Sequence, residues 1–134
     1  VKDLDFGLNH ILVRDAKGQK DRITMLADEI KTPLEVHLKF VKKQHENDLA
    51  RGFGSVFLPH ALAKKYKNAD KEWGWQYVFP SKTLSVDPRS GIKRRHHIHL
   101  NSLNRAIRNA AKIVDITKQI SSHTFRHTFA THLL

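Results

Sequence analysis

Two short apolar runs near the start of the chain predict a β-hairpin. Residues 8–13 are rich in Leu, Ile and Val, and residues 22–26 resume the same character. The polar stretch between them contains Lys17, Gly18 and Lys20. Apolar runs of this length joined by a short polar segment with glycine are typical of paired strands. We therefore expect an antiparallel hairpin with a basic tip.

A long helix is predicted after the hairpin. Thr32 suits the capping position, Pro33 suits the first helical position, and Glu35 completes a capping box. Apolar residues then recur at helical spacing, most charged residues fall elsewhere, and the glycines at 52 and 54 end the pattern. The apolar positions are Leu34, Leu38, Val41 and Leu49, and the charged positions are Lys39, Lys42, Lys43, Glu46 and Asp48.

The rest of the chain is less periodic and predicts shorter elements. Residues 58–66 suggest a short helix after a proline, residues 73–80 are rich in aromatic side chains, and residues 87–91 have turn composition. Asn101 can cap a further helix, and a last helix is expected to begin near Ser122. The predicted fold class is α+β, mainly α, with a small antiparallel hairpin or sheet at one edge.

The charge balance indicates a polyanionic partner. Lys and Arg number 24 against 13 Asp and Glu, which gives a formal net charge of +11, and ten histidines add to it below neutral pH. Such an excess is typical of a nucleic-acid binder, although composition alone does not separate DNA from RNA or from an anionic membrane surface. No apolar run approaches the length of a membrane span, so no membrane partner is expected. The absence of cysteine suits a reducing cytoplasm.

The segment from residue 121 to residue 132 carries the most specific chemical signal. His123 and Arg126 lie three positions apart, which places an imidazole and a guanidinium on the same side of a helical turn. The guanidinium can hold a phosphodiester through forked hydrogen bonds, and the imidazole can move a proton near neutral pH. Alone, this spacing is more typical of a solvated helix face, so its interpretation depends on the wider sequence.

The wider sequence resembles tyrosine recombinases. H-T-F-R-H-T-F-A-T-H-L-L is similar to the H-x-L-R-H-(S/T)-F-A-T-H-L box of that family, with Phe125 where leucine is usual. The resemblance implies that a tyrosine cuts DNA, forms a 3′-phosphotyrosine link, and rejoins the strands without metal or nucleotide cofactor. It implies that His123 takes part in proton transfer and that Arg126 clamps the scissile phosphate.

The hairpin tip resembles the G-K-G-x-K-x-R hairpin of the same family. Lys17 matches the lysine that serves as general acid for the 5′-hydroxyl, and Lys20 and Arg22 are expected to contact DNA. Ala16 stands where the first glycine is usual. By residue types alone the tip is more typical of a solvated turn, and Lys20 remains an alternative general acid.

The middle of the chain resembles integron integrases. L-P-H-A-L-A-K-K-Y, K-E-W-G-W-Q-Y-V-F-P-S, S-V-D-P-R-S-G and R-R-H-H are similar to the signature of this subfamily, which carries an extra helical insertion, here at about residues 55–90. The resemblance implies two DNA partners: a folded single-stranded cassette site with protruding bases, and a double-stranded integron site. It also implies that the full-length protein is a tetramer on DNA.

Protruding bases suit stacking on aromatic or imidazole rings beside cations, at roughly 1–3 kcal/mol per base. The candidate DNA contacts in the middle of the chain are Trp73, Trp75, Pro88, Arg89, Arg94, Arg95, His96 and His97. For Trp73, Tyr77 and Phe79, packing against the core is an equally good interpretation. A metal site at His96, His97 and His99 is the weaker alternative, because no cysteine or paired acidic ligand accompanies them. We expect no metal.

The family pattern also needs residues that this sequence does not assign. They are a first arginine before the hairpin, a second histidine or tryptophan after the final box, and the nucleophilic tyrosine; Tyr66 and Tyr77 lie in the insertion. We therefore expect a partial C-terminal catalytic domain at 1–134, without the N-terminal core-binding domain or the tyrosine segment, that does not cleave DNA alone. The alternative is a non-catalytic DNA-binding module that contacts phosphates only.

Overall fold

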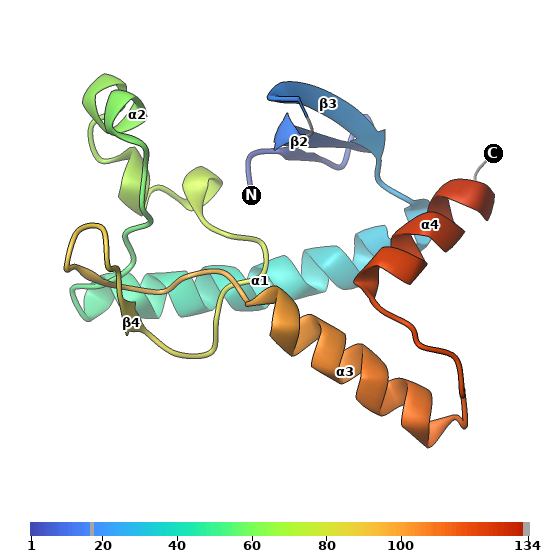
Figure 1. Cartoon of the computed structure of the whole chain (residues 1–134). Helices are drawn as coiled ribbons and strands as arrows, with labels where there is room; N and C mark the ends of the chain where they lie inside the picture. Colours follow the sequence, from blue (N-terminus) through green and yellow to red (C-terminus); the bar gives the residue numbers. More distant parts are fainter. Residues whose placement is uncertain (17, 133–134) are drawn as a thin grey trace. The chain divides into compact units, whose positions relative to one another are not determined.

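The chain forms two compact units in the computed structural model, which describes residues 1–16 and 18–132 (Figure 1). Unit 1 is Val1–His97 and unit 2 is Ile98–Leu134. Unit 1 contains a three-stranded sheet, a long helix and an irregular region, whereas unit 2 contains two helices. This mixture of helices and antiparallel strands confirms the predicted fold class.

The sheet at the start of unit 1 has the order β1-β2-β3 and is antiparallel throughout. Strands β2 (His10–Ala16) and β3 (Lys20–Met25) form the predicted hairpin, with Val13 opposite Arg22. Strand β1 (Leu4–Asp5) pairs with the other edge of β2. The sequence did not predict β1, because two residues are too few to show the alternation of a strand.

Helix α1 (Asp28–Ala50) begins one turn before the predicted start at Thr32. Its N-cap is Ala27, which makes no side-chain capping bond, and two acidic residues in its first turn stabilise the positive end of the helix dipole. Pro33 therefore lies inside the helix and not at its first position. The predicted end is correct, because the chain leaves the helix through Gly52 at a φ of 82°.

The buried face of α1 changes character along its length. Leu38 and Val41 are buried in its first part, and His45 and Asp48 are buried further on. Asp48 was predicted to lie among the charged residues away from the apolar positions, and this is wrong: it is 3% exposed. Position 48 lies seven residues after 41, which returns it to the same side of the helix.

Residues 51–97 fold with little regular structure against α1. They contain helix α2 (His60–Lys65), the short 3-10 helices η1 (Ala69–Lys71) and η2 (Trp73–Trp75), and the paired strands β4 (Ser85–Val86) and β5 (Lys93–Arg94). The helix after Pro59 and the turn at residues 87–91 are confirmed. In that turn the amide of Gly91 donates to the carbonyl of Asp87 at 2.7 Å.

Unit 2 consists of α3 (Leu100–Ile113), α4 (Ser122–His132) and the segment between them. The predicted start of α4 at Ser122 is confirmed, and the side chain of Asn104 in α3 accepts a hydrogen bond from the Ser122 amide at 3.0 Å. The predicted cap at Asn101 is wrong: His99 is the N-cap of α3, and its ring nitrogen accepts from the Asn101 amide. Among the described residues no helix is long and apolar enough to cross a membrane.

Candidate functional site

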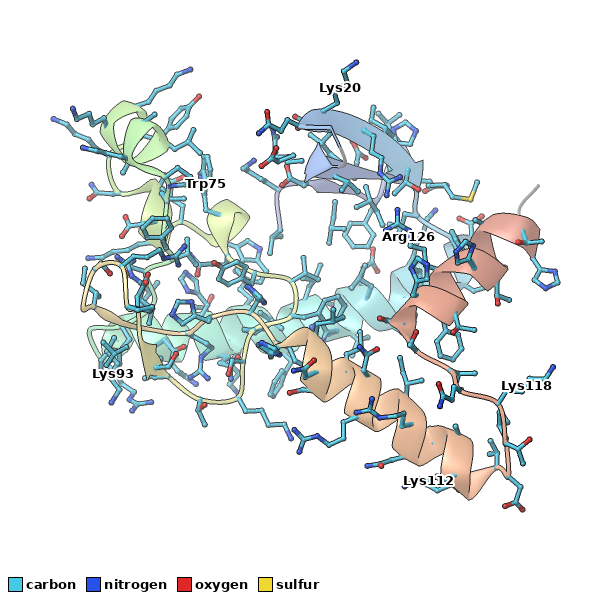
Figure 2. The ribbon with its side chains drawn as sticks, in the orientation of Figure 1. Lys20, Trp75, Lys93, Lys112, Lys118 and Arg126 are labelled. Atoms are coloured by element: carbon cyan, nitrogen blue, oxygen red, sulfur yellow. The ribbon has the colours of Figure 1, made fainter. Side chains whose placement is uncertain are left out.

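Helix α4 presents His123 and Arg126 on an exposed surface of unit 2. Both residues lie in the first half of the helix, whose start is held by the Asn104 contact. Within the described part of the chain the Arg126 guanidinium has no carboxylate or hydrogen-bond partner, and Figure 2 shows its place on α4. An exposed guanidinium without an internal partner retains all its donors for an anion such as a phosphodiester.

The imidazole of His123 has a close partner that the sequence analysis did not single out. Its Nε2 lies 3.1 Å from Nε2 of His127, one helical turn further along α4. The two rings meet edge to face, with centroids 4.6 Å apart and an angle of 89° between their planes. The signal was present in the sequence, because residues four apart on a helix are neighbours on its surface.

The β2–β3 hairpin carries the predicted basic tip. Lys17 lies outside the described residues. Lys20 and Arg22 are both exposed on β3, and neither has an ion-pair partner within the described part of the chain. Figure 2 shows the place of Lys20 on the hairpin. Their neighbour Arg14 is instead held by Asp3. Lys20 and Arg22 can therefore meet phosphate groups without giving up an internal ion pair.

The two tryptophans of unit 1 are half-buried, and each has a ring partner. The Trp75 ring centroid lies 5.7 Å from that of Tyr66, and the ammonium of Lys2 lies 4.5 Å from the Trp75 ring (Figure 2). The Trp73 centroid lies 6.1 Å from that of His45. Both tryptophans therefore take part in packing within unit 1. For Trp73 this agrees with the alternative interpretation of the sequence, and contact of either tryptophan with DNA stays a prediction.

A groove of about 690 Å³ opens beside Trp73, between the start of the chain and α1. Its walls include Trp73, Phe6 and Leu38, and its lysines are Lys2, Lys39 and Lys42. Concave sites of this size with apolar walls and a few charged groups are typical of small-molecule or nucleobase binding. The groove was not predicted from the sequence, because its residues come from three distant segments.

Arg94 and Arg95 make contacts inside unit 1. Arg94 is 8% exposed and donates to the Ser55 hydroxyl and the Val56 carbonyl, both at 2.8 Å. Arg95 forms a two-pronged ion pair with Asp48, with Nε–Oδ2 at 2.6 Å and Nη2–Oδ1 at 3.0 Å. Because Arg95 donates these hydrogen bonds to the Asp48 carboxylate, its pKa is raised. These internal roles were not predicted from the sequence.

The turn between β4 and β5 exposes Pro88 and Arg89. Arg89 donates to both carboxylate oxygens of Asp87, at 3.0 and 3.3 Å, and its guanidinium lies 3.6 Å from the centroid of the Phe57 ring. Asp87 is fully shielded from solvent, and hydrogen bonding to Arg89 lowers its pKa. Arg89 is thus held in one position while 53% of its side chain stays exposed.

The predicted histidines follow β5 on an irregular segment. His96 is half-buried, and His97 is exposed with its ring edge-on to Tyr77 at 5.3 Å between centroids. His99 caps α3 and belongs to unit 2. Among the described residues, no three His, Asp or Glu side chains are grouped so as to hold a metal ion.

Comparison with known proteins identifies the family. The Phage integrase family matches residues 1–134, the whole chain. The chain is 44% identical over 134 residues to an integrase/recombinase of Escherichia coli and to one of Pseudomonas aeruginosa. Each match covers all of this chain and 40% of the relative, so the chain spans less than half the length of these curated relatives. The chain belongs to the phage integrase family of tyrosine recombinases.

Proposed function

We propose that this chain is part of the catalytic domain of an integron integrase, a site-specific recombinase that exchanges DNA strands through a 3′-phosphotyrosine intermediate. The observation that carries the proposal is the exposed pair His123 and Arg126 on α4, in a chain that matches the phage integrase family over its full length. The net charge of +11 supports DNA as the partner.

The proposed roles follow from the chemistry of each group. Arg126 binds the nonbridging oxygens of the scissile phosphate and stabilises the charge that develops when the nucleophile attacks. His123 moves a proton at the same phosphate. Lys17, or Lys20 in its place, protonates the leaving 5′-oxygen, while Arg22 holds the neighbouring phosphate. Tyr66 and Tyr77 both precede His123 in the chain, whereas the resemblance places the nucleophilic tyrosine after the His123–Arg126 box, so neither is assigned as the nucleophile.

The test uses a protein of the relatives' length that contains this chain, incubated with a nicked suicide DNA substrate. We expect a covalent protein–DNA adduct, and we expect Arg126→Ala to slow its formation about 10²–10³-fold. His132→Ala, on the same helix, is the matched control and should leave the rate unchanged. DNA binding without any adduct from the unsubstituted protein would instead favour the non-catalytic binding module.

The groove beside Trp73 supports recognition of a protruding base. An unpaired base that enters it meets the aromatic surface of Trp73, and Lys39 and Lys42 in the same wall supply cations for the neighbouring phosphates. Lys2 also lines the groove but is paired with Asp3, and Glu35 is the acidic residue of the wall. Arg89, Pro88 and His97 supply a second exposed group of ring and cationic surfaces on unit 1. This recognition distinguishes an integron integrase from recombinases that act on duplex DNA alone.

Base recognition is tested with two DNA hairpins that differ only in having or lacking protruding bases. We expect the chain to prefer the hairpin with protruding bases, and Trp73→Ala to reduce this preference about tenfold, the value of one lost stack. Phe79→Ala removes an exposed aromatic ring that lines no part of the groove and serves as the control. Equal affinity of the unsubstituted chain for both hairpins would contradict the integron assignment and leave family membership intact.

A further inference from the structure

Helix α4 holds two imidazoles in an arrangement that fits a metal ion. His123 and His127 are four residues apart, both are exposed, and their Nε2 atoms lie 3.1 Å apart. A metal ion bound to two imidazoles at about 2.0–2.1 Å separates the nitrogens by about 2.9 Å at a right angle and about 3.4 Å at a tetrahedral angle. The observed separation lies between these two values.

We propose that His123 and His127 together bind one divalent transition-metal ion through their Nε2 atoms. In the metal-free chain one of the two rings donates its Nε2 hydrogen to the other. When the ion binds, that ring carries its proton on Nδ1 instead, so that both Nε2 lone pairs face the ion as neutral imidazoles. The remaining coordination positions are open to water or to another ligand. Histidines one helical turn apart are the spacing that zinc sites on helices use. Imidazole ligands select ions such as Zn²⁺, Ni²⁺ and Cu²⁺ over Mg²⁺ and Ca²⁺, which prefer oxygen ligands.

The surroundings make this a two-ligand site of modest affinity. No carboxylate lies on α4, and the neighbouring Arg126 repels a cation. A closed structural zinc site has four protein ligands, and among the described residues no third His, Asp or Glu side chain joins this pair. In zinc-dependent hydrolases that use two histidines four residues apart on a helix, the residue directly after the first histidine is a glutamate that acts as general base. Here that residue is Thr124, so the proposed site binds metal without hydrolytic chemistry.

Metal binding at this place has a consequence for the proposed recombinase. A bound ion occupies the ring nitrogen through which His123 can exchange a proton on this face of α4, so a metal and a proton compete for one lone pair. This consequence rests on the proposed function, whereas metal binding itself does not. A metal titration of the chain without DNA therefore tests the site alone, and the adduct assay without added metal tests the function alone.

The experiment titrates the chain with Zn²⁺ by calorimetry and follows the histidine ring signals by NMR. We expect the His123 and His127 signals to respond first, and His123→Ala and His127→Ala each to weaken Zn²⁺ binding at least about tenfold, because either change removes the chelate. His132→Ala is the matched control, since position 132 lies on a different face of α4, and its affinity should equal that of the unsubstituted chain. Mg²⁺ should shift neither signal.

Several results would overturn the proposal. They are no Zn²⁺ binding, a first response at other histidines, an equal loss in His132→Ala, or a loss smaller than about threefold in either His123→Ala or His127→Ala. Circular dichroism of each variant verifies that the helices remain. The ring signals of the unsubstituted chain give the assignment independently of any variant.

Discussion

The irregular segment at residues 51–97 and helix α4 use their arginines in different ways. In unit 1, Arg94 and Arg95 are bound to buried or half-buried groups of the same unit, including the Val56 carbonyl and the Asp48 carboxylate. In unit 2, Arg126 is exposed and has no such partner within the described part of the chain. An arginine that looks like a ligand contact in the sequence can therefore be used for contacts within the fold or remain available to a ligand. The structure of the neighbouring backbone determines which of the two occurs.

The deciding feature is the regularity of the backbone. Residues 51–97 form little regular structure, so many of their carbonyls lack a backbone donor, and buried carbonyls need one. Side chains supply it: His37 bonds the Val78 carbonyl at 2.7 Å, His45 bonds the Lys71 carbonyl at 2.9 Å, and Gln76 donates to two more. In α4 the interior carbonyls accept hydrogen bonds from amides one turn further along the helix, and the Arg126 side chain bonds no carbonyl within the described part of the chain.

The largest expected effect comes from breaking the buried ion pair of unit 1. Asp48→Ala leaves the Arg95 guanidinium without its charge partner, while its side chain is only 13% exposed. We expect the free energy of unfolding to fall by roughly 3–5 kcal/mol, because an uncompensated buried charge is costly. Urea unfolding followed by tryptophan fluorescence measures this, since both tryptophans lie in unit 1.

The matched control for that experiment is Asp21→Ala on the hairpin. Asp21 and its partner Arg14 are each 52% exposed and lie 3.5 Å apart. Asp21 also accepts a hydrogen bond from the exposed Asp15 amide at 3.0 Å. Together, two surface contacts of this kind are worth about 1–2 kcal/mol or less, which stays below the loss expected for Asp48→Ala. Equal losses in Asp21→Ala and Asp48→Ala would contradict the distinction between buried and surface cations.

A smaller effect is expected from the glycines that end α1. Gly54 has a φ of 92°, and an added Cβ would lie 2.8 Å from the Leu49 Cδ2 and 3.1 Å from the Leu49 amide nitrogen. Gly52 has a similar φ of 82° with open space around it. Gly52→Ala should cost about 1–2 kcal/mol through backbone strain alone. Gly54→Ala should cost about 1–3 kcal/mol more from the clash, and urea unfolding of the two variants measures the difference.

The positions of the helices and strands were predicted from the sequence more accurately than the contacts of the polar side chains. The hairpin, α2 and α4 follow from local patterns, because apolar spacing and capping residues are local properties. The predicted start of α1 was wrong: the helix begins at Asp28, and Asp28 and Glu29 in its first turn favour the positive end of the helix dipole ahead of the signal at Thr32. Family motifs located His123 and Arg126, whereas the partners of Arg94 and Arg95 lie up to 47 positions away. A local sequence pattern cannot predict a contact between residues that are so far apart in the chain.

A further expected effect is a dependence of stability on pH through Asp87. Hydrogen bonding to Arg89 lowers the pKa of Asp87 in the folded chain below its value in the unfolded chain, about 4. The resulting stabilisation is complete above about pH 4 and is lost as the pH falls through the lower pKa of the folded state. The stability difference between the unsubstituted chain and Asp87→Asn should therefore shrink between pH 6 and pH 2 in urea unfolding. A difference that stays constant across this range would contradict the prediction.

The smallest effect on stability should belong to the residues with the largest proposed effect on function. Arg126→Ala removes an exposed side chain without an internal partner in the described part of the chain, so the free energy of unfolding should change by no more than about 0.5 kcal/mol. The adduct rate of the longer protein should nevertheless fall about 10²–10³-fold. Asp48→Ala should behave in the opposite way when tested below its melting temperature, with a large loss of stability and a nearly normal adduct rate. If Arg126→Ala instead destabilised the chain as much as Asp48→Ala, Arg126 would serve the fold, and its assignment as the phosphate clamp would fail.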